Sequence, residues 1–330
     1  MENQSCNVAI IGAGTIGTAL GNILAETGRE PILLHSIEEQ VVKEINLTGI
    51  NSKYFPTLRL NSGLHATTDN KELEHCKIIF LAIPSVIMID YLKSIRAHLP
   101  SDALLVNLAK GFGSGYQTIL ECLMAEFPNP VCTMKGPSFA REIINRQPTG
   151  FTLGYEKEEQ ISMIPELFEH TNIHLDFSDD LRGVEILSIL KNIYAVVVGI
   201  VDAQFNSPNL RFLVLTKAFR EMRRVLRQFG GREDTLFNYC GYGDFALTAL
   251  NDLSRNRTLG LLIGKGFFTE HVSHELVLEG KTAVNVFYHE ISKTMCVEDH
   301  FPMIAELYRI FSTKYDVASF VERILSFKEE

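Results

Sequence analysis

The sequence lacks three features that would each point to a class of function: an excess of positive charge, a cysteine framework and an apolar run that crosses a bilayer. Its 31 lysines and arginines are outnumbered by 40 aspartates and glutamates. The net charge of -9 argues against a general affinity for nucleic acid or for an anionic membrane surface. The six cysteines show no C-x-x-C pairs or histidine neighbours at metal spacing, so we expect neither disulfides nor a metal site.

The longest apolar stretch, residues 186–201, is short for a bilayer span of about 20 residues and contains Lys191 and Asn192 near its middle. We therefore expect a buried helix here rather than a membrane segment. The first residues show no basic region followed by a cleavage site, and they lead directly into a glycine-rich turn. The expected location of the protein is the cytoplasm.

The chain has 330 residues, of which 46% are hydrophobic and 22% are charged, and it contains no low-complexity tract. This balance is typical of a chain that folds throughout its length. The length exceeds that of one ordinary hydrophobic core and suits two domains of roughly 150 residues each.

Short β-rich runs alternate with helical patterns in the first half of the chain, and this rhythm predicts parallel βαβ units. The predicted strands are residues 7–11, 30–35, 78–83, 103–108, 131–134, 149–154 and 172–177. From residue 181 onward the patterns are helical, at residues 182–203, 210–229 and 245–253. We therefore predict an α/β Rossmann-like domain over residues 1–180 and an all-α domain over residues 181–330.

A glycine-rich turn lies directly between the first predicted strand and a predicted helix over residues 15–26. In that context, Gly12 permits a tight turn, Gly14 lets the backbone approach a pyrophosphate, and Gly17 allows the helix to pack closely on the strand. The exposed N–H groups of the first helical turn then form a phosphate site. The motif predicts binding of NAD(P) or FAD, and the alternative is a turn that serves packing alone.

Selection between NAD and NADP normally depends on the residue that ends the second strand. An acidic residue there bonds the ribose hydroxyls, whereas an arginine accommodates the 2′-phosphate of NADP. In this chain the strand ends at His35 and is followed by Ser36, and these residues provide neither group. The sequence therefore favours NAD only slightly.

Polar residues follow further predicted strands, at the carboxyl edge where open α/β sheets bind their ligands. Pro84 and Ser85 follow the strand at residues 78–83, and Lys110 follows the strand at residues 103–108. Lys110 suits an anionic substrate, and the alternative is an ordinary surface lysine. Ser138, which follows the strand at residues 131–134, suits either a ligand contact or a helix cap.

In the second half, Lys191 lies within an apolar helix, where a lysine is costly unless it is paired or used in its neutral form. The alternative is a lysine that extends to the helix edge. Asp244 and Thr248 are four residues apart and would share one helix face. The alternative is that Asp244 is an acid at a helix start that interacts with the helix dipole. Arg255 and Asn256 offer donors that match phosphate oxygens.

Taken in this order, the motifs resemble the NAD(P)-dependent glycerol-3-phosphate dehydrogenase family in its bacterial form, across nearly the whole chain. The matching strings are IGAGTIGTAL, LAIPS, LAKGF, GPSFAREI, LKNIYAVVVGIVDA, CGYGDFALT, SRNR and LEGKTA. The resemblance implies a Rossmann-like cofactor domain and a helical domain similar to that of 6-phosphogluconate dehydrogenase, with the active site in the cleft between them. It also implies a homodimer that interconverts sn-glycerol 3-phosphate and dihydroxyacetone phosphate with NAD or NADP.

The resemblance further implies roles for individual residues. Lys191 is expected to be the general acid/base and Lys110 its cationic neighbour, while Asp244 and Thr248 complete the catalytic group. Contacts with the substrate are expected from Lys110, Ser138, Asn192, Arg255 and Asn256. Contacts with the cofactor are expected from Gly12, Gly14, Thr15, Ile16, Gly17, Ser36, Pro84, Lys110, Ala140, Arg255 and Glu279.

Some positions depart from the family pattern and bear on the choice of substrate. Lys135 stands where a serine is common, residues 204–209 replace a glycine-rich loop, and Phe212 replaces a small residue. One alternative is therefore a related dehydrogenase that acts on another small phosphorylated or carboxylated ketone. Two others are a non-catalytic protein that senses the nicotinamide pool and a mainly structural protein. The presence of Lys191 together with Asp244 argues against the sensor.

Overall fold

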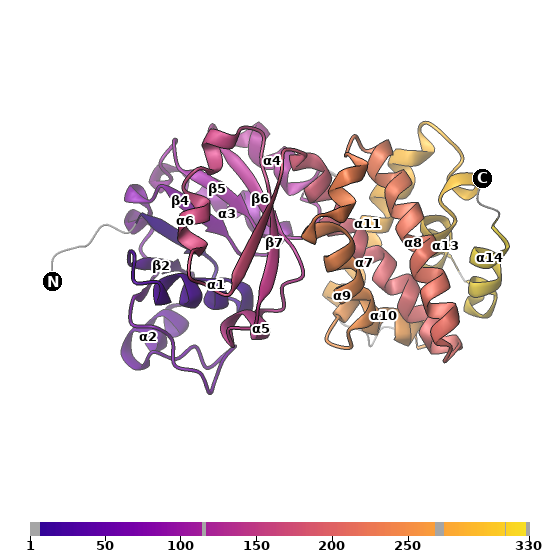
Figure 1. The fold of residues 1–330 in the computed structure, drawn as a ribbon, viewed down its shortest axis with the longest axis horizontal. Helices are drawn as coiled ribbons and strands as arrows, with labels where there is room; N and C mark the ends of the chain where they lie inside the picture. Colours follow the sequence, from indigo (N-terminus) through magenta and orange to yellow (C-terminus); the bar gives the residue numbers. More distant parts are fainter. Residues whose placement is uncertain (1–6, 114–116, 268–273, 314, 328–330) are drawn as a thin grey trace. The chain divides into compact units, whose positions relative to one another are not determined.

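The structure is a computed structural model that describes residues 7–113, 117–267, 274–313 and 315–327. The chain divides into two compact units, Met1–Leu181 and Arg182–Glu330. The first unit is built from strands and helices, and the described part of the second contains helices (Figure 1). This confirms the predicted fold class, an α/β Rossmann-like part followed by a helical part.

In the described residues of the first unit, one sheet has eight strands in the order β3-β2-β1-β4-β5-β6-β7-β8. Neighbouring strands are parallel except for β6 and β7, which are antiparallel. The strands are β1 (Val8–Ile11), β2 (Ile32–His35), β3 (Leu64–Thr67), β4 (Ile78–Leu81), β5 (Leu104–Asn107), β6 (Val131–Lys135), β7 (Thr149–Gly154) and β8 (Ile173–Ser178).

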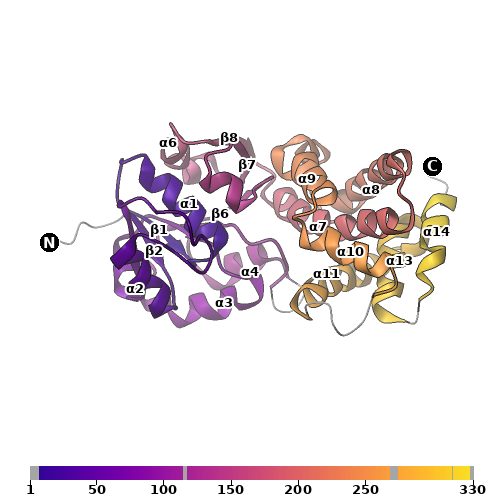
Figure 2. The ribbon, with the colours of Figure 1, turned by 90° about the horizontal axis from the view of Figure 1, so that it is seen from below.

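Helices cover both faces of this sheet, which explains why the central strands β1 and β4 are apolar at every position. Alternate residues of β1 face different layers. Val8 and Ile10 pack with α1, α2, α5 and α6, whereas Ala9 and Ile11 pack with α3 and α4. Figure 2 shows α3 and α4 on the side of the sheet opposite to α6. These helices are α1 (Thr15–Glu26), α2 (Glu39–Thr48), α3 (Ser85–Ser94), α4 (Ile119–Glu126), α5 (Ala140–Ile144) and α6 (Ile164–Phe168), with 3₁₀ turns η1 (Asn70–His75), η2 (Arg96–His98) and η4 (Glu158–Ile161).

The strand order reverses at β1, because β2 lies on one side of it and β4 on the other. The register pairs Ile11 with His35 of β2 and with Leu81 of β4, so all three strands end at the same level. Such a switch point is where open α/β sheets bind ligands, beyond the carboxyl ends of the strands. The glycine turn after β1 and the segment after β4 both begin there.

The second unit is built around α7 (Leu181–Gln204), the one described helix long and apolar enough to cross a membrane. Its most apolar window is 94% buried inside the structure, which is the situation of a core helix rather than a membrane span. The other helices of the unit are α8 (Pro208–Gln228), α9 (Asp244–Leu250), α10 (Arg255–Gly264), α11 (His274–Ser292), α12 (Val297–His300), α13 (Pro302–Ser312) and α14 (Phe320–Ser326), with shorter turns η5 (Glu233–Phe237), η6 (Tyr239–Gly243) and η7 (Val317–Ser319).

Two glycines let α7 and α10 approach until their backbones touch. A Cβ atom on Gly199 would lie 2.3 Å from the carbonyl oxygen of Arg257, and one on Gly260 would lie 2.1 Å from that of Val196. Side chains larger than hydrogen would force the helices apart. This contact holds the first turn of α10 beside α7.

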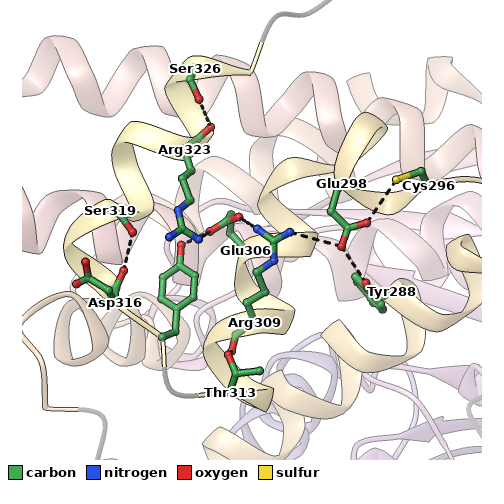
Figure 3. Close-up of polar contacts among 11 residues, drawn as sticks. Tyr288, Cys296, Glu298, Glu306, Arg309, Thr313, Asp316, Ser319, Arg323 and Ser326 are labelled. Carbon is green, nitrogen blue, oxygen red and sulfur yellow. Dashed lines mark hydrogen bonds and ion pairs between the residues drawn. The ribbon is translucent and has the colours of Figure 1, made fainter.

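The helices at the end of the unit are tied by a buried carboxylate on α13 (Figure 3). Glu306, which is 4% exposed, accepts hydrogen bonds from Arg309 at 2.5 Å and from Tyr315, and it pairs with Arg323 of α14 at 3.5 Å. Charge-assisted bonds to a buried acid are among the stronger polar contacts in proteins. They hold α14 against α13.

Candidate active site

The glycine turn after β1 has the geometry that a dinucleotide requires. Gly12 has a φ of +114°, and a Cβ there would lie 2.6 Å from the carbonyl oxygen of Ala82. A Cβ on Gly17 would lie 1.9 Å from the carbonyl oxygen of Gly12, so helix and strand are in backbone contact. A Cβ on Gly14 would meet no atom within 4 Å, which leaves its face of the turn open. The open face and the amino end of α1 together fit a pyrophosphate.

A buried amide that sequence reasoning did not single out braces this turn. The Nδ2 atom of Asn51, which is fully buried, donates to the carbonyl oxygen of Ala13 at 3.0 Å and to Oγ1 of Thr18 at 2.9 Å. The hydroxyl of Thr18 donates in turn to Ala13 at 3.1 Å. These bonds fix the peptide between the first two glycines from a segment 38 residues away in the chain.

A pocket of about 290 Å³ opens beside the turn, within the first unit. Its walls combine the first residues of α1 with the ends of β5 and β6 and the start of α5. They are Thr15, Ile16, Leu108, Lys110, Met134, Ser138, Phe139, Ala140 and Phe151. The predicted cofactor residues Thr15, Ile16 and Ala140 thus line the same pocket as Lys110. The aromatic residues of the wall lay outside the sequence prediction.

Lys110 is half-buried in this pocket rather than free at the surface. Its Nζ donates to the carbonyl oxygen of Gly136 at 3.2 Å and lies 3.5 Å from Oγ of Ser138. The Ser138 hydroxyl donates to the same carbonyl at 2.9 Å. Because Phe139 occupies the capping position of α5, Ser138 is not the helix cap that the sequence left open. Lys110 and the amino end of α1 give the pocket a positive character that suits an anionic ligand.

The end of β2 presents neutral and acidic groups. His35 is buried, and this burial lowers the pKa of its imidazole, whose Nδ1 lies 3.2 Å from the hydroxyl of Tyr91. The Ser36 hydroxyl is buried and accepts a hydrogen bond from the backbone N–H of Glu38 at 3.1 Å. The Glu38 carboxylate pairs with Lys53 at 2.5 Å. A 2′-phosphate would therefore meet no arginine at the end of this strand.

Pro84 and Ser85 lie where the prediction puts them, at the carboxyl end of β4. Pro84 is exposed and precedes the first residue of α3. The backbone N–H of Ala82 donates to Ile11 at 2.8 Å, which keeps this segment in line with the glycine turn. The exposed face of Pro84 is thus available to a ligand at the switch point.

The second unit buries a lysine together with an acid. Lys191 on α7 is 4% exposed, and Asp244 at the start of α9 is 1% exposed. The Lys191 Nζ donates to Oδ1 of Asp244 at 2.5 Å and to Oγ1 of Thr248 at 3.1 Å. Lys191 therefore does not extend to the helix edge, which was the alternative to a functional position. A buried ion pair of this kind is weak evidence for stability and is typical of functional sites.

The chain before α9 explains how Asp244 reaches Lys191. One turn of π-helix, η6, precedes α9, and Gly241 within it leaves helical geometry at φ −88° and ψ −107°. A Cβ on Gly241 would lie 2.2 Å from the carbonyl oxygen of Leu236. The turn allows α9 to begin at Asp244, one helical turn before Thr248.

The predicted phosphate-binding residues lie on the first turn of α10. The predicted helix over residues 245–253 ends early, at Leu250, and Ser254 starts a new helix by accepting a hydrogen bond from the N–H of Arg257 at 3.3 Å. Arg255 is exposed and Asn256 is half-buried there. At this position the partial positive charge at the amino end of a ten-residue helix lies beside the charge of the Arg255 guanidinium.

The remaining predicted contacts fall on α7 and α11. Asn192 is half-buried beside Lys191. Glu279 lies outside the residues whose side chains the structure describes. The structure brings Asp244 and Thr248 to Lys191, and brings Ser138 to Lys110.

A second buried ion pair supports the first turn of α10 and was not predicted. Arg257 is 7% exposed, and its Nη2 lies 2.9 Å from Asp202 near the end of α7. Arg211 at the start of α8 donates to the same carboxylate at 2.6 Å. The sequence holds one signal for this pair, the pattern Arg-Asn-Arg at residues 255–257. Residues two positions apart on a helix do not share a face, so Arg257 points to a different side from Arg255.

The doubly wound sheet and the glycine turn define a Rossmann-type protein of the dinucleotide-dependent class. Comparison with known sequences refines this class. Residues 7–161 match the N-terminal part of NAD-dependent glycerol-3-phosphate dehydrogenase, and residues 180–322 match its C-terminal part. The chain belongs to the NAD-dependent glycerol-3-phosphate dehydrogenase family.

Individual relatives match this chain over most of their length. The chain is 31% identical over 322 residues to "Glycerol-3-phosphate dehydrogenase [NAD(P)+]" of Clostridium botulinum (strain Eklund 17B / Type B), with 96% of each chain covered. It is 38% identical over 265 residues to the protein of the same name from Methanothermobacter thermautotrophicus, covering 78% of this chain and 80% of the relative. The crystal structure of glycerol-3-phosphate dehydrogenase from Coxiella burnetii superimposes with a TM-score of 0.87 at 27% identity, covering 98% of this chain and 99% of that one.

Proposed function

We propose that Lys191 is the general acid/base in the interconversion of sn-glycerol 3-phosphate and dihydroxyacetone phosphate. The protein is an NAD(P)-dependent oxidoreductase that acts on a CH–OH group, as its relatives are named. The observation that carries the role of Lys191 is its burial against Asp244, with 2.5 Å between Nζ and the carboxylate. A buried lysine held by an acid and a hydroxyl is positioned to exchange a proton at one fixed point.

The glycine turn fits the cofactor, because its open face over Gly14 and the amino end of α1 would receive the pyrophosphate. Thr15 and Ile16 would hold the dinucleotide from the pocket wall. When bound, the nicotinamide supplies hydride to the carbonyl carbon of the ketone or accepts it from the alcohol carbon. A related dehydrogenase for a different ketone is not favoured by the relatives, which share one name.

Residues of the chain would transfer the proton to or from the substrate oxygen and would balance the negative charge of the substrate. In reduction, the Lys191 ammonium would polarise the substrate carbonyl and donate its proton to the oxygen as the alcohol forms. In oxidation, the neutral amine would take the hydroxyl proton. Asp244 and Thr248 orient the Nζ atom, and Lys110 would counter the negative charge of the substrate.

The phosphate of the substrate would be held by Arg255 and Asn256 on the first turn of α10. The guanidinium offers a planar set of donors, and the helix end adds partial positive charge. Ser138 and Asn192 would supply further hydrogen bonds to the substrate. This arrangement selects a phosphorylated three-carbon substrate over its unphosphorylated form.

The reaction is tested by following the absorbance of NADH with the purified protein. We expect turnover with dihydroxyacetone phosphate and a kcat/KM lower by a factor of about 10² or more with dihydroxyacetone, which lacks the charged group. Saturable binding of NADH without turnover would contradict the proposal. That result would favour a protein that senses the nicotinamide pool.

We further infer a preference for NAD over NADP. The neutral His35, the hydroxyl of Ser36 and the acidic Glu38 at the end of β2 offer a 2′-phosphate no arginine, and the ammonium of Lys53 beside them is paired with Glu38. The expected kcat/KM for NADH exceeds that for NADPH by a factor of about 10 or more. Equal or reversed values would contradict this inference.

We also propose that the protein is a cytoplasmic homodimer, as the family resemblance suggests. Large apolar side chains are exposed on the second unit, among them Phe212, Leu213 and Phe237. Exposed apolar surface of this kind is common where chains associate. Light scattering coupled to gel filtration would give twice the mass of 37.1 kDa for a dimer, and the mass of a single chain would contradict it.

A further inference from the structure

Lys135, the last residue of β6, is a charged side chain for which the proposed mechanism has no direct use. It is fully buried, with an exposed fraction of 0%, and it does not line the pocket described above. Its Nζ donates to the carbonyl oxygen of Asn107 at 3.2 Å and to that of Ala109. Burying a lysine is costly unless its charge is well bonded, so this position calls for a physical reason.

The carbonyl groups that Lys135 binds belong to the segment that carries Lys110. The peptide of Ala109 directly precedes Lys110 and continues from the end of β5 into a stretch without regular structure. The side-chain oxygen of Asn107 accepts the N–H of Ala109 at 2.9 Å, and the hydroxyl of Thr133 donates to the Asn107 carbonyl at 3.2 Å. The backbone before Lys110 is therefore bonded to side chains of β6 at two carbonyl groups, those of Asn107 and Ala109.

Lys110 makes a similar bond in the opposite direction, toward the segment that follows β6. Its Nζ donates to the carbonyl oxygen of Gly136, the residue directly after Lys135. The ends of the adjacent strands β5 and β6 are thus joined by lysine-to-carbonyl bonds in both directions. The bond from Lys135 is buried, and the bond from Lys110 comes from the pocket wall. Neither lysine can shift without disturbing the backbone that the other one holds.

We propose that Lys135 is a positioning residue that fixes the ammonium of Lys110 in the pocket. The proposal rests on the role given to Lys110 in the proposed function. Lys135 contributes bonds that hold the peptide before Lys110, and makes no contact with the substrate. Small displacements of a group that meets the reacting atoms reduce rates by large factors, about 10² for an error of about 1 Å.

The test is a double-mutant cycle in the full-length enzyme, with Lys135→Met and Lys110→Met, alone and together. Methionine keeps an unbranched side chain as far as the Cε position and removes the ammonium donors. We expect Lys135→Met to lower kcat by a factor of about 10 to 100, with less than about a 3-fold change in the KM for NADH. In the Lys110→Met background, the second substitution should change kcat by less than about 3-fold, because it acts through the missing side chain.

Two results overturn the proposal: an unchanged kcat in Lys135→Met, or an equal loss of kcat in both backgrounds. A purely structural lysine would lower the melting temperature and give the equal loss. Failure of the role given to Lys110 in the proposed function would show in a different variant. In that case Lys110→Met alone would leave kcat and the KM for dihydroxyacetone phosphate unchanged.

If Lys135→Met does not fold, Thr133→Val decides the matter, since it removes another donor to the Asn107 carbonyl while leaving Lys135 in place. We expect a loss of kcat by about 3-fold or more that disappears in the Lys110→Met background. The matched control is Thr149→Val, a buried hydroxyl of the same sheet that donates to Gln147 at 3.0 Å. A loss of kcat that is equal in Thr133→Val and Thr149→Val would overturn the proposal, as would no loss in Thr133→Val.

Discussion

Breaking the buried pair of Lys191 and Asp244 from either side should destabilise the second unit. The exposed fractions are 4% and 1%, so the remaining partner would be left charged and largely without water. Removing one member of a buried pair costs about 3 to 5 kcal/mol. A typical domain has about 5 to 15 kcal/mol of unfolding free energy, so Lys191→Met and Asp244→Asn should each fold with a much reduced margin.

The double variant Lys191→Met/Asp244→Asn carries no buried charge at this position. We expect its unfolding free energy to return to within about 1 to 2 kcal/mol of the wild type, because the cost of desolvating the pair offsets most of its attraction. Its turnover should stay as low as that of Lys191→Met, because the general acid/base is still missing. The pair would then be present for chemistry rather than for stability.

The assay is urea denaturation followed by far-ultraviolet circular dichroism at one pH. The two compact units provide an internal reference, since a transition of the first unit should not move. A double variant that loses the sum of the two single losses, about 6 kcal/mol or more, would refute the reasoning. The pair would in that case stabilise the fold in its own right.

Further predictions concern pH, the cofactor turn and the substrate. Burial raises the pKa of Glu221 to about 7, above the value of about 4.3 for an unfolded carboxyl. The folded state therefore keeps a proton that the unfolded state loses, and the unfolding free energy should fall by about 3 kcal/mol between about pH 4.5 and pH 7 and level off above. Glu221→Gln should remove this slope in urea titrations, and an undiminished slope would contradict the assignment. Gly17→Ala places a Cβ 1.9 Å from a carbonyl oxygen and should destabilise the first unit by about 3 kcal/mol or more. Gly14→Ala should keep stability within about 0.5 kcal/mol while raising the KM for NADH, and normal KM values would refute a pyrophosphate over Gly14. Arg255→Ala should raise the KM for dihydroxyacetone phosphate by about 10-fold or more, with kcat much less affected, because it removes a charge-assisted contact; an unchanged KM would remove Arg255 from the phosphate site.

The central strands could be predicted because burial on both faces makes them continuously apolar, as in β1 and β4. Residues 36–77 received no predicted element, although α2, β3 and η1 lie there. The strand β3 is short, lies at the edge of the sheet and exposes His65, while α2 buries only Val41 and Ile45. A four-residue strand and a helix with two buried positions leave little periodicity in a sequence.

The direction of β7 relative to β6 could not be predicted from sequence patterns either. The run at residues 149–154 predicts a strand equally well in either direction, and its antiparallel pairing with β6 is a tertiary choice. This pairing has a consequence for the site, because it keeps the segment between the strands at the carboxyl edge. Ser138, Ala140 and Phe151 consequently line one pocket.

For the site, the sequence indicated the residue types more readily than their partners. A lysine in an apolar helix requires a partner, yet nothing local identifies Asp244, which is 53 residues away. The buried contacts of Lys135 and of Asn51 were not predicted either. Their significance depends on which carbonyl groups they meet, and this is set by packing between distant segments.

The role of Lys191 is tested most directly by the turnover of Lys191→Met with dihydroxyacetone phosphate and NADH, measured beside the affinity for NADH from its fluorescence. The expected result is a kcat lower by a factor of about 10³, within the range for loss of a general acid/base, with NADH affinity within about 3-fold of the wild type. A kcat within about 10-fold of the wild type, in a variant that binds NADH normally, would contradict the assignment of Lys191.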